Sequence, residues 1–267
     1  MKFGTGIGIV LSLVGIAMGA TMEGTNVMVV LNVPAALIVL VGTLGATIAA
    51  CGLPAHIRLP KLYMKAVMPE ELDLVKRVTE LVGYAEKARR DGLLALDEAV
   101  KDIEDPFTKK GLQLVVDGTD PDLVAAVLDA ENEAMRKRHA AARNPFTQAG
   151  ALAPTMGIVG TVFGLVNVMN NLNNPSSLGP LIAAAFLATL IGVGSANVVF
   201  LPVANRLKEL SEEEIHFREM TLEGILAIQA GDNPRVVSEK LMAYVPPAVR
   251  PTEEEQQAAL AAQKQAA

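Results

Sequence analysis

The chain has 267 residues, of which 51% are hydrophobic and only 19% charged, and its mean hydropathy is +0.35, a balance typical of an integral membrane protein. A net charge of −6 without a basic stripe argues against a nucleic-acid-binding protein. The single Cys51 excludes an internal disulfide framework, and the three histidines show no metal-ligand spacing.

Four segments carry no Asp, Glu, Lys, Arg or His and are long enough to cross ~30 Å of hydrocarbon as helices. Short polar turns join the first to the second and the third to the fourth, so we expect two transmembrane hairpins, 1–51 and 147–203. The predicted spans are 4–20, 27–51, 147–170 and 180–203.

The distribution of Lys and Arg predicts the orientation of these spans. Apart from Lys2, every Lys and Arg lies between 52 and 146 or from 204 onward. By the positive-inside rule, both termini and the segment 52–146 are therefore expected in the cytoplasm. Residues 1–20 also read as a cleaved signal peptide, but an intact first span pairs with the second and puts 52–146 on the positive side.

The segment 52–146 is expected to be a helical domain. One helix is predicted to follow Pro69, with the acids of "EELD" in its first turn and an apolar stripe at helical spacing. This stripe comprises Leu72, Val75, Val78, Leu81 and Val82. A second helix is predicted to begin before Pro121, capped by Thr119 or Asp120, and to run toward the membrane at Pro145.

Segment 204–250 should hold the C-terminal cytoplasmic helices. The fourth span is expected to continue as a helix that stops at Gly231, and a shorter helix is expected from Asn233 and Pro234 to about Ala243. Residues 251–267 are rich in Ala, Gln and Glu and have little to bury, so we expect them to be disordered.

Small residues line one face of each of the last two spans. In the third span this face comprises Gly150, Pro154, Gly157, Thr161 and Gly164, and in the fourth it comprises Ala185, Thr189, Gly192 and Ala196. Such a face is typical of tightly packed helices, but one hydroxyl per helix also suits a polar pathway whose carboxylate comes from another chain. Pro154 and Pro202 free backbone carbonyls in or at the end of a span, which fits either a packing kink or such a pathway.

The stretches "ALAPTMGIVGTVFGLVNVM" (151–169) and "LIAAAFLATLIGVGSANVVFLPVANRLK" (181–208) resemble the last two spans of the MotA/PomA family of bacterial flagellar motor stator subunits, within the MotA/TolQ/ExbB superfamily. Three further stretches are similar to family segments in the same order, and the resemblance extends from about residue 4 to 250. They are "VPAALIVLVGTLGATIAA" (33–50), "EKARRDGLLALDEAV" (86–100) and "EGILAIQAGDNPRVVSEKL" (223–241).

This resemblance implies an all-α protein of the bacterial cytoplasmic (inner) membrane, whose four spans form a homo-oligomeric ring, expected to be pentameric, around two helices of a MotB/PomB-type partner. The partner carries the ion-binding aspartate, and inward H⁺ or Na⁺ flow drives torque on the rotor protein FliG. No enzyme activity, bound cofactor or metal is implied. The hydroxyl at Thr161 slightly favours Na⁺, because proton-driven members carry alanine there.

The resemblance also implies roles for individual residues. Thr161 and Thr189 match threonines that face the partner aspartate and the ion, and Pro154 and Pro202 match prolines implicated in coupling ion passage to torque. The glycines expected to pack the last two spans are Gly150, Gly157, Gly160, Gly164 and Gly192.

In the cytoplasmic signature, Arg89 matches the family's torque-contact arginine, with Arg90 beside it. The family's glutamate falls at Asp97, with Glu98 adjacent, so either acid could contact the rotor. Without the resemblance, the same run reads as an ordinary solvated helix face.

Three other interpretations were weighed against the residues. An ExbB/TolQ-type energiser shares the last two spans with their threonines. That group has only three spans, so the hairpin 4–51 and the stretch "ARRDGLLALD" disfavour this interpretation. A non-conducting membrane scaffold would use the glycine faces for packing alone. An enzyme is disfavoured because no Ser/His/Asp or Cys/His order stands out and the Gly-rich motif lies within a span.

Overall fold

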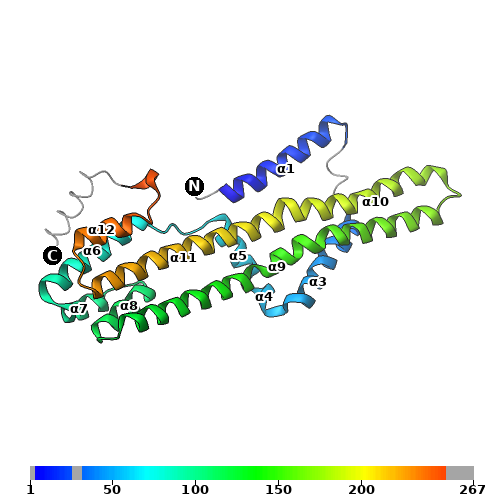
Figure 1. The fold of residues 1–267 in the computed structure, drawn as a ribbon. Coiled ribbons are helices and arrows are strands. Elements are labelled where there is room, and N and C mark those ends of the chain that lie inside the picture. The colour runs from blue at the N-terminus through cyan, green and yellow to red at the C-terminus, as the bar shows by residue number, and fades with distance from the viewer. Residues whose placement is uncertain (1–3, 26–31, 251–267) are drawn as a thin grey trace. The chain divides into compact units, whose positions relative to one another are not determined.

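A computed structural model describes residues 4–25 and 32–250, and every regular element in these two ranges is a helix (Figure 1). The chain divides into two compact units. The apolar unit comprises Met1–Glu70 and Arg138–Leu210, and the charged unit comprises Glu71–Lys137 and Ser211–Ala267. Residues 52–70, 138–146 and 204–210, predicted to be cytoplasmic, therefore group with the apolar segments.

Four helical segments in the described ranges are long and apolar enough to cross a membrane, which agrees with the four predicted spans. The first is α1 (Gly4–Met22). The second is built from α2 (Val33–Ala36), a π-helical turn η2 (Leu37–Val41) and α3 (Gly42–Cys51). The third lies in α9 (Pro121–Asn170), and the fourth lies in α10 (Pro175–Ser195), a second π-helical turn η4 (Ala196–Phe200) and α11 (Leu201–Gln229).

Two spans begin at other residues than predicted. Residues 27–31, predicted as the start of the second span, lie outside the described ranges, and the helix begins at Val33 because the Asn32 side chain accepts the Ala35 N–H at 3.1 Å. The fourth span begins at Pro175, five residues earlier than predicted, since proline is well suited to the first helical position.

No helix end marks the predicted boundary between 146 and 147. Instead α9 continues from Pro121 to Asn170 through Pro145 and Pro154. Its start confirms one of the two predicted caps, because the Asp120 carboxylate accepts the Asp122 N–H at 3.0 Å. Proline cannot donate to the preceding turn, so each of the two prolines leaves one carbonyl of the helix without its usual partner.

Two short helices follow the second span in the apolar unit, α4 (Leu53–Ile57) and α5 (Leu59–Val67). Buried side chains of α1, α5, α9 and α11 form one cluster there, with Ala66, Phe146 and Val203 among its members. A second cluster joins the second span to α10 through Ala35, Val39 and Ala188. The second span thus packs against the helix that carries Thr189.

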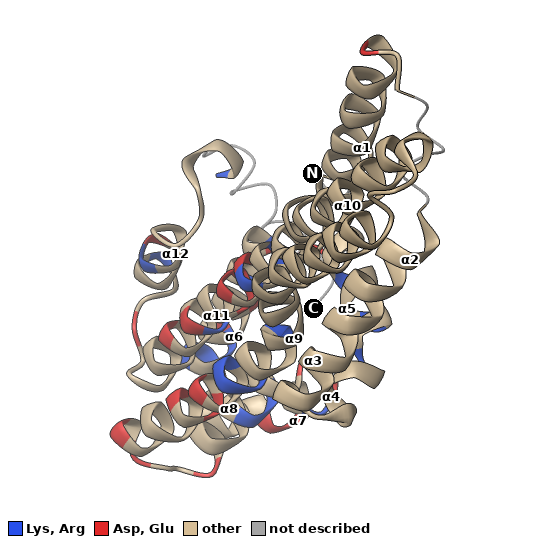
Figure 2. Ribbon diagram, turned by 90° about the vertical axis from the view of Figure 1, so that its right-hand side faces the viewer, with Lys and Arg blue, Asp and Glu red and all other residues tan. Residues whose placement is uncertain are grey.

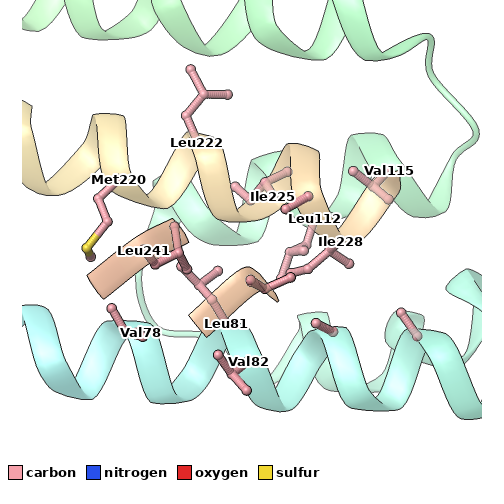
Figure 3. Close-up of a cluster of buried hydrophobic side chains, with 14 of the residues drawn as sticks. Val78, Leu81, Val82, Leu112, Val115, Met220, Leu222, Ile225, Ile228 and Leu241 are labelled. Carbon is pink, nitrogen blue, oxygen red and sulfur yellow. The ribbon is translucent and has the colours of Figure 1, made fainter. Parts of the chain in front are cut away.

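The charged unit is built around one apolar core. Its elements are α6 (Leu74–Asp91), η3 (Leu93–Ala95), α7 (Leu96–Lys101), α8 (Pro106–Val116), parts of α9 and α11, α12 (Pro234–Met242) and η5 (Pro247–Val249). Figure 3 shows side chains of α6, α8, α11 and α12 that meet in this core. Burying one such leucine or isoleucine contributes roughly 1.5–3 kcal/mol, so the shared core stabilises the unit.

The helix predicted to follow Pro69 begins only at Leu74. The Asp73 carboxylate accepts the Lys76 N–H at 2.9 Å and caps the helix, so the acids of "EELD" precede the helix instead of occupying its first turn. Leu72 therefore lies outside α6 and is 42% exposed. The rest of the predicted stripe faces the core: Val78, Leu81 and Val82 are buried, and Val75 packs against them.

The C-terminal helices agree with the prediction. Helix α11 ends at Gln229, two residues before Gly231, whose positive φ of 74° ends the helical path. Helix α12 begins at Pro234, and the Asn233 side chain accepts the Arg235 N–H at 3.1 Å. The predicted disordered tail, 251–267, lies outside the described residues.

Charged residues separate sharply between elements. Figure 2 shows basic and acidic residues on α6, α11 and α12 and lysines on α8, whereas α1, α2 and α10 are free of Lys, Arg, Asp and Glu. A partly buried ion pair joins α6 to the start of α8, with Arg77 Nη1 2.9 Å from Asp105 Oδ2 and the guanidinium 4.9 Å from the Phe217 ring centre. Burial alone would raise the pKa of Asp105, but hydrogen bonds from Thr108 and the charge of Arg77 hold it below its usual value.

Candidate functional site

Helices α9 and α10 approach each other through their small residues. A methyl group added at Gly157 would lie 2.9 Å from the Ala188 carbonyl oxygen, and one added at Gly192 would lie 2.5 Å from the Ala153 carbonyl oxygen. Added methyls at Gly160 and Gly164 would lie 2.6 Å and 2.5 Å from the Cβ atoms of α10 alanines. Only glycine permits backbones this close, so the small-residue faces of the two helices are in contact.

The contact between α9 and α10 brings Thr161 and Thr189 together. Their hydroxyl oxygens are 2.5 Å apart, and the Thr161 hydroxyl also lies 3.0 Å from the Gly157 carbonyl and 3.1 Å from the Ala185 carbonyl. The two hydroxyls supply only two hydrogens for this group of four oxygens. Both side chains are half-buried, so the group retains an accessible side. We call it the threonine pair.

Pro154 lies in α9, and Pro202 lies in α11, which continues the chain of α10 after the turn η4. Gly150, whose carbonyl Pro154 leaves without its helical partner, packs against Leu201, the residue before Pro202. The π-helical turn η4 ends at Phe200, two residues before Pro202, near the point where a proline cannot donate to the preceding turn. The two prolines therefore weaken the backbone ladders of both helices near one shared contact.

The predicted rotor-contacting residues lie in the charged unit, where α6 ends and α7 begins. Gly92, with φ 86°, ends α6 and turns the chain into η3. Arg89 and Arg90 are exposed on the last turn of α6, and Asp97 and Glu98 occupy the first turn of α7. The structure thus gathers these four charges around one turn, in the unit that does not hold the threonine pair.

Ion pairs within the chain distinguish these four charges. Arg90 forms a two-pronged bond with the Asp91 carboxylate at 3.0–3.1 Å, which lowers the pKa of Asp91, and Asp97 pairs with Lys101 Nζ at 3.0 Å. Within the described residues, Arg89 and Glu98 form no ion pair. Within the described residues, Arg90 and Asp97 are therefore held by exposed ion pairs, whereas Arg89 and Glu98 are not.

Two buried threonines of the second span and a histidine of α4 form a polar group that was not predicted. Thr43 and Thr47 are each 2% exposed, and the His56 ring lies 3.0 Å from the Thr47 hydroxyl through Nε2 and 2.9 Å from the Gly52 carbonyl through Nδ1. The spacing of the two threonines by four residues was the available signal. The hydrogen bonds of Thr47 and His56 stabilise the end of the second span, because each satisfies a buried polar atom, whereas the buried Thr43 hydroxyl forms no hydrogen bond among the described residues.

No candidate metal centre appears in 4–25 and 32–250, since these residues bring no three His, Cys, Asp or Glu side chains together. A cavity of about 320 Å³ opens in the charged unit beside Arg77 and Phe217. Its arginines already pair with acids, Arg77 with Asp105 and Arg218 with Glu131 and Glu214. We assign no ligand to this cavity.

Comparison with known proteins places the chain in a family. Residues 99–220 match the family described as the MotA/TolQ/ExbB proton channel family. Motility protein A of Bacillus subtilis is 36% identical over 242 residues, which covers 90% of this chain and 89% of that protein. The solved structure of C. jejuni MotAB has a TM-score of 0.90 at 28% identity and covers 95% of this chain and 100% of that chain. The flagellar MotAB stator complex from Bacillus subtilis has a TM-score of 0.84 at 36% identity, covering 91% and 95%.

Proposed function

Because this chain belongs to the MotA/TolQ/ExbB proton channel family and is a flagellar stator subunit, we propose that it converts ion flow across the bacterial inner membrane into torque on the rotor protein FliG. It does so together with a MotB-type partner, which the stator complexes of its relatives contain. Several copies surround the partner helices as a ring, which we propose to be a pentamer, with both termini in the cytoplasm.

The main support for this proposal is the threonine pair, which lies between two predicted spans that contain no Asp, Glu, Lys, Arg or His. Its hydroxyls lie 2.5 Å apart and retain an accessible side, but neither hydroxyl titrates near neutral pH. An ion crossing hydrocarbon needs a carboxylate or a comparable charge to offset its desolvation. The partner must therefore supply the carboxylate, and the threonine pair supplies oxygen atoms beside it.

The chemistry of the pair fits both candidate ions. Oxygen ligands suit a hard cation such as Na⁺, and the hydroxyls and carbonyls of the pair offer four of them within one contact. A chain of water molecules along the same oxygens would relay protons. The hydroxyl of Thr161 slightly favours Na⁺ as the transported ion.

The two prolines and the exposed charges of the α6–α7 turn would couple ion passage to the rotor. The weakened hydrogen-bond ladders at Pro154 in α9 and Pro202 in α11 allow these two helices to shift when the partner carboxylate binds and releases its ion. The charged unit carries the displacement to its own surface, where Arg89 and Glu98 are free to contact FliG.

The experiment uses a strain that lacks its own stators and receives this subunit together with its native partner. Swimming speed is measured while external Na⁺ is varied at constant pH, and again after a protonophore is added. A speed that rises and saturates with Na⁺ supports a sodium-driven stator, and a speed that depends only on the proton gradient supports a proton-driven one. Failure to restore motility under both conditions would contradict the proposed function.

A second measurement tests the role of the partner. The subunit reconstituted alone in vesicles should conduct neither H⁺ nor Na⁺, and addition of the partner should start ion flux. Flux through the subunit alone would contradict the need for a partner carboxylate.

A further inference from the structure

Helices α4 and α5 lie where all four predicted spans end on the same side. Cys51 is the last residue of the second span, and its Sγ atom lies 3.5 Å from Nδ2 of Asn144, just before the predicted third span. At the far end of α5, a methyl group added at Gly6 in the first span would lie 3.1 Å from Val67 Cγ1. Ala66 of α5 shares a buried cluster with side chains at the end of the fourth span. These ends are the ones predicted to face the cytoplasm, so α4 and α5 run along that side of the membrane.

Helix α5 has one buried side and one exposed side. Ala66 is buried, and Leu62 packs against the same cluster. On another side of the helix Lys61 and Lys65 are exposed, and Met64 is 51% exposed. Residues three and four apart lie on one side of a helix, so these three side chains form a single stripe. Exposed apolar and basic side chains on one helix are typical of a segment that lies in a membrane interface.

The segments at this side of the apolar unit carry an excess of positive charge. Residues 52–70, 138–146 and 204–210 contain seven Lys and Arg and only two acids, although the net charge of the whole chain is −6. One of the two acids, Glu209, pairs with Arg206 at 3.1 Å. The excess is therefore local to the residues that group with the apolar spans.

Two cations of this excess form no ion pair among the described residues. They are Arg58 and Lys61, which are exposed and lie three residues apart at the start of α5. Ile57, the last residue of α4, precedes Arg58 and is 74% exposed. We call Ile57, Arg58, Lys61 and Met64 the interface stripe.

We propose that the interface stripe binds anionic phospholipids of the cytoplasmic leaflet, such as phosphatidylglycerol. Arg58 and Lys61 bind the phosphate of the headgroup, and Ile57 and Met64 enter the boundary between headgroups and acyl chains. A soluble anion would match the two charges but would leave both apolar side chains in water, so a lipid fits the stripe better. This inference rests on the membrane orientation and goes beyond the proposed function, because it requires neither the transported ion nor the rotor.

The size of the effect follows from the two charges. Each Lys or Arg close to an anionic membrane surface adds about fivefold to the affinity for it, so two predict a preference of roughly tenfold to thirtyfold for anionic over zwitterionic lipid. Salt should weaken this preference, because it screens exposed charges.

The test uses the full chain in its complex with the native partner, delipidated in detergent. The midpoint of thermal unfolding is measured while phosphatidylglycerol, phosphatidylcholine or inorganic phosphate is added. Arg58→Gln/Lys61→Gln removes both charges of the stripe, and Arg58→Lys/Lys61→Arg keeps them. Lys76→Gln/Arg235→Gln is the matched control, because it removes the same charge from side chains of the charged unit that are 74% and 88% exposed.

We expect phosphatidylglycerol to raise the midpoint of the wild type at about tenfold lower concentration than phosphatidylcholine does. Arg58→Gln/Lys61→Gln should need about tenfold more phosphatidylglycerol, with its response to phosphatidylcholine unchanged, whereas the charge-keeping variant and the control should behave like the wild type. If the double variant does not fold, Lys61→Gln alone should still show a shift of about threefold to fivefold.

Three results would overturn the proposal. One is an unchanged response to phosphatidylglycerol in the variants that lack the charges. Another is equal stabilisation of the wild type by inorganic phosphate, because the charges would then bind a soluble anion. The third is dissociation of the ring in Arg58→Gln/Lys61→Gln before any lipid is added, because the occupant of the stripe would then be a second copy of this chain.

Discussion

The hydroxyl oxygens of Thr161 and Thr189 lie 2.5 Å apart across the contact between α9 and α10. Each hydroxyl comes from a different candidate span, so their meeting depends on the way the two helices pack. The glycine contacts on either side hold this distance.

Replacing Thr189 with valine keeps the shape of the side chain and removes the hydroxyl. We expect ion flux through the complex with the partner to fall about tenfold, because the Thr161 hydroxyl and the ion lose an oxygen neighbour. Thr189→Ser should retain most of the flux. The control is Thr155→Val, since the Thr155 hydroxyl is exposed and bonds only to its own helix at Leu152. Equal flux in Thr189→Val and the wild type would contradict a pathway role.

Gly192→Ala should destabilise the assembled complex by about 1–3 kcal/mol, because the new methyl meets the Ala153 carbonyl oxygen at 2.5 Å. Gly194→Ala on the same helix is a matched control, since its methyl would meet nothing within 4 Å. Thermal unfolding of the detergent-solubilised complex measures both variants. Similar midpoints for the two would show that the glycine face is not required for close packing.

Glu98, which has no ion pair among the described residues, should contribute more to motor torque than Asp97, which pairs with Lys101. We expect Glu98→Gln to lower motor torque about two- to fivefold, the equivalent of an exposed ion pair of roughly 0.5–1 kcal/mol. Asp97→Asn should have a smaller effect, because Asp97 is already paired with Lys101 at 3.0 Å. Torque on a tethered bead measures both, and a larger loss in Asp97→Asn would reverse the assignment.

The charged unit should lose stability in acid, because protonation of Asp105 removes its stabilising contribution. Its pKa is lowered in the folded state, so its stabilising contribution is fully present above the unfolded pKa of about 4 and is lost as pH falls through the lower folded value. Asp105→Asn should destabilise the protein by about 1–3 kcal/mol at neutral pH, because Arg77 loses the nearer of its two carboxylate partners and keeps only Glu80. Unfolding followed from pH 7 to acid should show the two proteins converge, whereas a constant gap would exclude this carboxylate as the cause.

The all-helical class and the positions of most helices could be predicted from the sequence, because they depend on residues that are neighbours in the chain. The four apolar segments contain no charged side chain, so their crossing of a membrane follows from length and hydropathy alone. The end of α11 near Gly231 and the start of α12 after Asn233 depend on a few adjacent residues and were predicted for that reason. The start of α6 was misjudged because Asp73, and not the proline before it, supplies the cap.

Only the tertiary structure decided which predicted residues meet. Spacing put Thr161 and Thr189 on the small-residue faces of their own helices, but their hydrogen bond depends on contacts between α9 and α10. Spacing also left Asp97 and Glu98 equivalent, and the pairing of Asp97 with Lys101 separates them. Local pattern determines which segments become helices and which faces are apolar, whereas the partner of each side chain depends on residues distant in the sequence, which only packing brings within reach.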